Sequence, residues 1–167
     1  MGRIFAASPG ALERHLGDEE VAARITAAHS AVLAGIHENV VGGPFNLNDV
    51  SIRRYVIGLF KHAPVERLHA LFLDGQGRYL NDCMLFEGTP GHLRGTLRPI
   101  VSRAIDIGAV GVILMHNHPS GDPRPSDTDV EMTKRLRASL ADLELHLVDH
   151  LVVAGAAIIS MRGSGLI

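Results

Sequence analysis

Residues 110–129 read VGVILMHNHPSGDPRPSDTD, and this stretch decides the fold class of the chain. The first six residues carry no polar side chain, which predicts a strand buried on both faces. The loop that follows is stiff because it contains three prolines and a glycine. Ser126 then begins a predicted helix that runs to about Leu140. A buried strand followed by a helix is typical of an α/β domain.

Four polar residues in this stretch have the spacing of a metal site. His116 and His118 are two residues apart at the strand end, so both imidazoles leave the same face. Ser126 and Asp129 are three residues apart on the first helical turn and therefore share a face. Asp129 can supply a third ligand, while Ser126 presents its hydroxyl to the open fourth position. Two histidines, one carboxylate and a water are a common way of holding catalytic zinc.

Each half of this pattern also has a purely structural interpretation. Ser126 followed three residues later by Asp129 resembles a capping box, which by itself would account for both residues. Two histidines at a strand end can simply form its polar terminus. Neither interpretation explains why the histidines, the rigid loop and the cap follow one another in this order, so a metal site is the prediction for the whole stretch.

The chain after residue 65 predicts a mixed sheet around the buried strand. The turn at residues 74–77, DGQG, joins two apolar segments as a hairpin, and a second hairpin closes the chain around residues 154–156. A helix precedes the buried strand. The predicted elements are strands 68–73, 79–86, 144–153 and 157–161 and a helix over 97–108. Strands alternating with helices indicate an α/β domain with flanking helices.

The first part of the chain is predicted to be helical. A short helix runs from Ser8 to near Gly17, and Asp18 caps a longer amphipathic helix that ends at residues 41–44, VGGP. A third helix begins at Asn48 or Asp49. We therefore divide the chain into an N-terminal helical segment, residues 1–45, and an α/β domain, residues 46–167.

Composition excludes several classes of protein. The chain has 167 residues, 46% of them hydrophobic, and no apolar run approaches the roughly 20 residues of a membrane span. The N-terminus has no secretory signal core, and the single cysteine, Cys83, allows no internal disulfide. We expect a soluble cytoplasmic protein with Cys83 as a small core residue. A net charge of −2 gives no overall electrostatic attraction to nucleic acid.

The polar stretch resembles a known family of metalloproteases. His-x-His, seven residues, Ser, two residues and Asp form the signature of JAMM/MPN+ enzymes, and the chain matches it without a gap. HNHPSGDPRPSDTD, residues 116–129, resembles the bacterial RadC branch of that superfamily. The likeness extends to ERLHALFLD, residues 66–74, and DHLVV, residues 149–153, and covers about residues 46–167. It implies the MPN fold, a cytidine-deaminase-like mixed sheet with flanking helices.

The resemblance also implies a reaction and a role for each matching residue. The enzymes bind one zinc ion (Zn2+) through the two histidines and the aspartate, which correspond to His116, His118 and Asp129. A glutamate on an earlier strand is their general base, and Glu66 is the one acid at the family's spacing before the end of the strand that reads LFLD, residues 71–74. The motif serine, Ser126, would help to stabilise the oxyanion. The implied function is hydrolysis of a peptide or isopeptide amide bond in a peptide or protein substrate; neither the particular substrate nor the oligomeric state follows from the sequence.

Alternative functions remain at this point. Full-length relatives carry a helix-hairpin-helix region that can bind a DNA phosphate, but residues 16–20, LGDEE, keep one glycine and place three acids there. We interpret residues 1–45 as a degenerate remnant of that region and expect no strong nucleic-acid binding. A DNA-associated repair module is the alternative function. The letters His-Asn-His suggest a nuclease only typographically, because such nucleases scatter these residues over a ββα unit. An inactive scaffold is a further alternative, but this chain keeps every ligand.

Other residues near these motifs have structural interpretations. His69 and His150 lie in apolar strands and are interpreted as satisfied structural histidines rather than ligands. Asp122 and Arg124 lie on the loop beside the predicted site, where they either contact substrate or are solvated.

Overall fold

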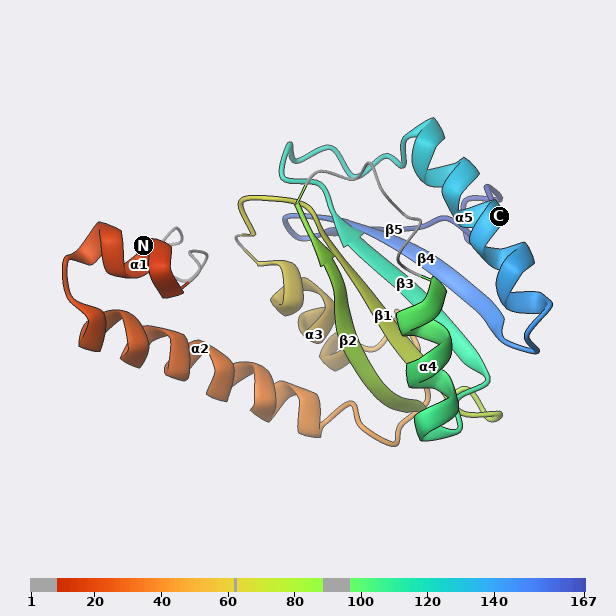
Figure 1. Cartoon of the computed structure of the whole chain (residues 1–167), viewed down its shortest axis with the longest axis horizontal. Coiled ribbons are helices and arrows are strands. Elements are labelled where there is room, and N and C mark those ends of the chain that lie inside the picture. Colours follow the sequence, from red (N-terminus) through yellow and green to blue (C-terminus); the bar gives the residue numbers. More distant parts are fainter. Residues whose placement is uncertain (1–8, 62, 89–96) are drawn as a thin grey trace.

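A five-stranded mixed sheet forms the centre of the computed structural model, which describes residues 9–61, 63–88 and 97–167 (Figure 1). The strands are β1 (Arg67–Leu73), β2 (Tyr79–Glu87), β3 (Gly111–Asn117), β4 (His146–Ala154) and β5 (Ala157–Ser160). Their order is β2-β1-β3-β4-β5; β3 and β4 are parallel, and the other neighbouring pairs are antiparallel. The helices are α1 (Pro9–Leu16), α2 (Glu19–Glu38), α3 (Val50–Phe60), α4 (Leu97–Ile107) and α5 (Asp127–Ala141). The predicted α/β class is confirmed.

Three helices begin where the sequence places a capping side chain. Asp18, Asp49 and Ser126 are the N-caps of α2, α3 and α5. Each caps because its side-chain oxygen accepts a backbone N–H of the first turn that has no partner within the helix. These three predicted starts are confirmed, whereas Ser8, the predicted start of the first helix, lies outside the described residues.

A separate apolar layer covers each face of the sheet. Helices α4 and α5 pack on the face that carries Leu68, Ala70, Phe72, Val112 and Leu114. Helix α3, with the end of α2, packs on the opposite face, which carries Leu71, Leu73, Ile113, Met115 and Leu151. Strand β3 lies between the two layers and all of its residues are buried, as predicted. His116 follows Leu114 by two residues and therefore faces α4 and α5.

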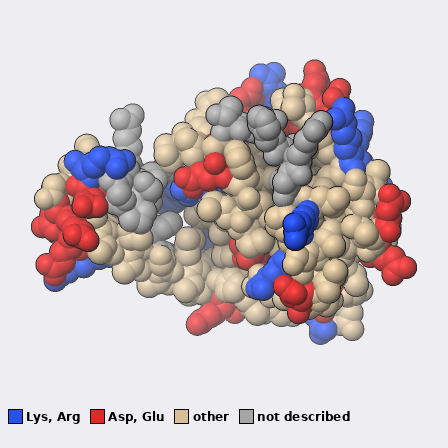
Figure 2. Space-filling model, viewed as in Figure 1, with Lys and Arg blue, Asp and Glu red and all other residues tan. Residues whose placement is uncertain are grey.

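Helices α1 and α2 form a hairpin that extends away from the sheet (Figure 1). Gly17 joins them with a φ of +66°, in the left-handed region that favours glycine at a helix end. The exposed acids Asp18, Glu19 and Glu20 follow, and Figure 2 shows acidic side chains gathered at this end. Carboxylates thus occupy the positive end of the α2 dipole. Within the described ranges, neither α2 nor any other helix combines the length and apolarity that a bilayer crossing needs.

A partly buried polar cluster ties α2 and α3 to the sheet on the face opposite α5. Asp82 on β2 accepts hydrogen bonds from the hydroxyls of Tyr55, at 2.5 Å, and Tyr79. His37 Nε2 lies 2.8 Å from the Tyr79 hydroxyl. Burial, reinforced by Asp82, raises the pKa of both tyrosines. His69 lies beside this cluster. Its Nδ1 is 3.7 Å from Asp82 and has no hydrogen-bond partner among the described residues, so the prediction that this histidine is satisfied is wrong.

Replacing Asp82 by alanine tests this cluster. Asp82→Ala removes the acceptor of two buried phenols, so we expect a loss of about 2–3 kcal/mol in the free energy of unfolding. Urea unfolding followed by far-ultraviolet circular dichroism measures it. Asp106→Ala, at an exposed position of α4, is the matched control and should change stability by less than about 0.5 kcal/mol. Equal stability of the two variants would contradict the structural role of the cluster.

Candidate metal centre

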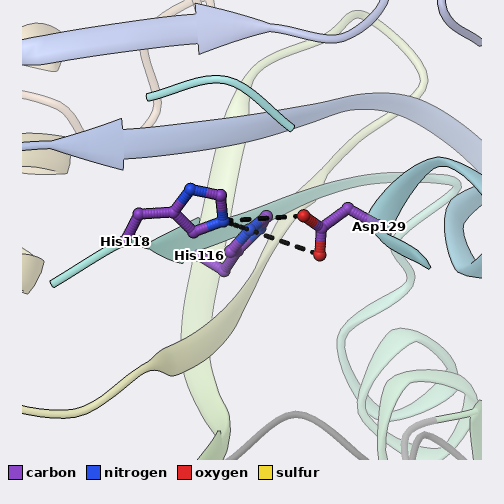
Figure 3. A group of neighbouring side chains, drawn as sticks. All are labelled: His116, His118 and Asp129. Carbon is purple, nitrogen blue, oxygen red and sulfur yellow. Dashed lines mark hydrogen bonds and ion pairs between the residues drawn. The ribbon is translucent and has the colours of Figure 1, made fainter. Parts of the chain in front are cut away.

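Three side chains from two elements converge at the carboxyl end of β3. His116 is the second-to-last residue of β3, His118 directly follows the strand, and Asp129 lies in the first turn of α5. Figure 3 shows both imidazoles and the carboxylate pointing toward one another. His116 and Asp129 are buried, with 6% and 8% of their surface exposed. The structure therefore brings together the three residues that the sequence selects as ligands.

The distances between these groups suit a small divalent cation. Nε2 of His116 and Nε2 of His118 are 2.9 Å apart. The two oxygens of Asp129 each lie 3.5 Å from one of these nitrogens. Four ligands at zinc bond lengths of about 2.0–2.1 Å in a tetrahedron lie about 3.3 Å from one another. The observed separations bracket that value, so the donor set fits such an ion with little rearrangement.

Ser126 positions the Asp129 carboxylate through a capping box. The Ser126 backbone N–H donates to Asp129 Oδ2 at 2.8 Å, and its hydroxyl donates to the same oxygen at 2.6 Å. The backbone N–H of Asp129 in turn lies 3.2 Å from the Ser126 hydroxyl oxygen. Burial alone would raise the pKa of Asp129, but the adjacent His116 ring and the hydrogen bonds from Ser126 outweigh it and lower that pKa. The capping box and the ligand cluster are thus both present, and the cap orients the carboxylate.

The rigid loop orients His118. Its Nδ1 donates a hydrogen bond to the backbone carbonyl of Asp122 at 2.8 Å, which leaves the lone pair of Nε2 directed at the cluster. The side chain of Asp122 turns away to Arg124, whose guanidinium donates at 2.6 Å. These hydrogen bonds lower the pKa of the Asp122 carboxyl to about 2. Asp122 therefore holds a ligand ring through its carbonyl and is a poor proton acceptor through its side chain.

His150 lies directly behind His116, a contact that the sequence reasoning missed. His116 Nδ1 is 2.8 Å from His150 Nε2, and His150 Nδ1 is 2.6 Å from the hydroxyl of Thr133 on α5. His150 and Thr133 are fully buried. Burial lowers the pKa of His150 to about 3, so the ring is neutral. The sequence hinted at this contact only through Thr133, which follows Asp129 by four residues and therefore shares its helix face.

Strand pairing brings Glu66 to the same edge of the sheet. Leu68 pairs with His116, and continuing this antiparallel register by two residues sets Glu66 opposite His118, on the face of His116. The Asn117 side chain fixes the backbone here: it accepts from the Arg67 N–H at 2.7 Å and donates to the Val65 carbonyl at 3.1 Å. Glu66 is half-buried. Glu66 thus directly precedes β1, at the edge of the sheet where β3 ends.

Comparison with known protein families shows which family the chain belongs to. The family model described as the RadC-like JAB domain matches residues 48–166. The chain belongs to this family. The RadC-like JAB domain is of the JAMM type, and in this chain it contains the whole sheet, α3, α4, α5 and the three candidate ligands.

Similar curated proteins carry the name UPF0758 protein. One from Bordetella avium (strain 197N) is 39% identical over 132 residues, which are 79% of this chain and 59% of that protein. One from Rhodobacter capsulatus is 33% identical over 167 residues, 99% of this chain and 78% of that protein. One from Pseudomonas syringae pv. syringae is 38% identical over 119 residues, 71% of this chain and 53% of that protein. The chain thus spans only part of their length, and their name states no reaction.

A cavity of about 760 Å³ lies on the α2/α3 side of the sheet, and His118 is the one candidate ligand among its lining residues. His118 and Asn117 line it where β3 ends, and α2 and α3 supply its apolar wall. Arg54 and Lys61 of the α3 region also line it, and both are exposed. The lining residues from the helices and the β4–β5 turn include Val32, Leu33, Ile36, Ile57, Phe60, Val153 and Gly155. The volume is in the range of about 300–1,000 Å³ that ligand pockets occupy.

Removal of any one ligand should abolish metal binding. We expect the purified RadC-like domain, loaded with zinc and dialysed, to retain about one ion per chain, and His116→Ala, His118→Ala and Asp129→Ala each to lose it. Elemental analysis by mass spectrometry measures the ratio. His146→Ala is the matched control, because His146 is exposed and pairs with Gly111 at the opposite end of β3. Unchanged zinc content in the three ligand variants would remove the site.

Proposed function

We propose that this RadC-like domain is a zinc-dependent metallohydrolase that cleaves a peptide or isopeptide amide bond. The observation that carries the proposal is the convergence of two histidine Nε2 atoms and the Asp129 carboxylate within 4.8 Å of one another. Both histidine Nδ1 atoms are already engaged, by His150 and by the Asp122 carbonyl, so the two Nε2 atoms face the cluster. Two histidines and one carboxylate leave a fourth position open, as catalytic zinc sites do.

The chemistry divides between the ion and the protein. A bound zinc ion supplies a water that ionises near pH 7 and a positive charge that polarises the substrate carbonyl. Glu66 accepts a proton from the attacking water while the water oxygen bonds to the carbonyl carbon of the substrate. Glu66 then donates this proton to the amide nitrogen as the carbon–nitrogen bond breaks. The products are a carboxylic acid and an amine, so water is the only co-reactant.

Ser126 has two tasks in this proposal. Its hydroxyl donates to Asp129 Oδ2 and so keeps the carboxylate in place. When Asp129 binds a cation, its oxygens become weaker hydrogen-bond acceptors, and the Ser126 hydroxyl, which is on an exposed residue, can turn toward the substrate. There it would donate to the oxygen that gains negative charge in the transition state.

In this proposal the cavity on the α2/α3 side, which reaches the candidate site at His118 alone, receives a side chain of a peptide substrate. Its wall is mostly apolar, which suits the side chains of a peptide segment, and Arg54 and Lys61 add positive charge at its lining. No ion pair of Arg54 or Lys61 with another residue occurs in the described part of the chain. A carboxylate on the substrate would therefore find a free cation beside the apolar wall.

Replacing Glu66 by glutamine separates proton transfer from metal binding. Glu66→Gln keeps the shape but cannot accept a proton, so hydrolysis should fall by about 10²–10⁴. Zinc content and melting temperature should stay at the wild-type values. A peptide library from a digested bacterial proteome is the substrate, and new amino groups are labelled and identified by mass spectrometry. Labelling both α-amino and ε-amino groups distinguishes peptide from isopeptide cleavage.

Glu87→Gln is the matched control for that experiment. Glu87 lies near Glu66 at the end of β2, but its pairing with Arg67 puts it on the opposite face of the sheet. This variant should cleave as the wild type does. Full activity of Glu66→Gln would rule out Glu66 as the general base. Absence of any zinc-dependent cleavage by the wild-type chain, with zinc bound, would rule out the hydrolase.

We also propose that this chain does not bind nucleic acid strongly. The carboxylates of Asp18, Glu19 and Glu20 surround the α2 N-terminus, where a phosphate would otherwise accept hydrogen bonds. On the face in Figure 2, Lys and Arg side chains are interspersed with Asp and Glu.

We therefore expect a dissociation constant above about 1 μM for duplex or single-stranded DNA at physiological salt. Fluorescence anisotropy with labelled oligonucleotides over a salt series measures it. Submicromolar binding at that salt would instead favour the DNA-associated repair module.

A further inference from the structure

The ring of His116 is held by a chain of hydrogen bonds that returns to a second ligand residue. His116 Nδ1 contacts His150 Nε2 at 2.8 Å, and His150 Nδ1 contacts Thr133 Oγ1 at 2.6 Å. Thr133 Oγ1 in turn lies 2.6 Å from the backbone carbonyl of Asp129. The chain therefore joins β3, β4 and α5, and it begins and ends on candidate metal ligands.

The direction of each hydrogen bond follows from the one between the Thr133 hydroxyl and the Asp129 carbonyl. A carbonyl oxygen can only accept, so the Thr133 hydroxyl donates to Asp129. The same hydroxyl then has only lone pairs for His150, whose Nδ1 must carry the hydrogen. The sulfur of Met161, 3.9 Å from the hydroxyl, is a weak acceptor and does not compete with the carbonyl.

The proton positions on the two rings are then determined. A fully buried imidazole without a carboxylate partner stays neutral and has one N–H, so Nε2 of His150 is an acceptor. His116 Nδ1 must donate to it, which leaves Nε2 of His116 with a lone pair. That lone pair faces His118 and Asp129. The opposite tautomer would place a hydrogen where the ion has to bind.

We propose that Thr133 and His150 are positioning residues that fix the tautomer of His116 and so prepare its Nε2 to bind a metal ion. The effect on metal affinity rests on the metal binding proposed above. The tautomer of His116 can be observed without metal. The two residues act through His116 and contact neither the ion nor the substrate. Partners of this kind commonly contribute about 10–100-fold to metal affinity.

The first experiment measures the tautomer directly in the metal-free chain. Long-range ¹H–¹⁵N correlation spectra of ¹⁵N-histidine-labelled protein show which ring nitrogen carries hydrogen, and His116→Gln assigns the signals. The expected result for the wild type is a single form of His116 protonated at Nδ1. A wild-type His116 protonated at Nε2, or an equal mixture of both forms, would overturn the proposal.

The second experiment removes only the hydroxyl. Thr133→Val has nearly the same shape but cannot donate to Asp129 or accept from His150, so His116 should become a mixture of tautomers. Its zinc dissociation constant, measured by competition with a chromophoric chelator, should rise about 10–100-fold. Thr133→Ser keeps the hydroxyl and should restore both the single tautomer and the wild-type affinity.

Melting temperatures of the metal-free variants separate this role from a structural one. A purely structural residue would lower the melting temperature of Thr133→Val and leave the His116 spectrum unchanged, which contradicts the proposal. If Thr133→Val does not fold, the wild-type spectrum still decides. If the wild type binds no zinc, the proposed function fails, while the tautomer measurement continues to test the hydrogen-bond chain by itself.

Discussion

Polar groups buried at the carboxyl end of β3 must find partners inside the protein, and this requirement organises the site. His116, Asp129 and Thr133 lie where α5 packs against the sheet, and an unpaired polar group there would cost about 1–3 kcal/mol. The capping box satisfies the carboxylate, and His150 satisfies the ring of His116. Because every partner is itself held by backbone or by a helix, the geometry of the ligand cluster is set before any ion binds.

The sheet topology explains why this end of the molecule carries the chemistry. The parallel strands β3 and β4 both end here, and α5 starts at the same edge, so the ligands come from a strand end and a helix start. Antiparallel β1 begins where β3 ends, so Glu66, the residue before β1, lies at the same edge of the sheet. At this strand end polar side chains meet the edge of the apolar interior, so His116 is buried while His118, at the start of the following loop, is partly exposed.

Hydrogen-bond partners also give the acids around the site different tasks. Asp129 is held as a carboxylate by its hydrogen bonds and suits a cation, whereas the Asp122 carboxylate is neutralised by Arg124 and is a weak base. Glu66 is half-buried, forms no ion pair in the described part of the chain, and is the acid to which we assign proton transfer in the proposed reaction. The polar cluster around Asp82 lies on the other face of the sheet and serves stability, since it joins α2 and α3 to β2.

The local features of this protein were determined by its sequence. The apolar run 110–115 had to be a strand with both faces covered, Asp18, Asp49 and Ser126 had to cap helices, and the spacing of His116, His118 and Asp129 was enough to select the ligands. These features depend on period and on side chains a few residues apart. Only the tertiary structure decided what lies behind the ligands, because His150 is 34 residues from His116 and reaches it through the parallel register of β3 and β4. No periodicity in a single sequence encodes that register, so His150 could be predicted as buried but not as the partner of a metal ligand.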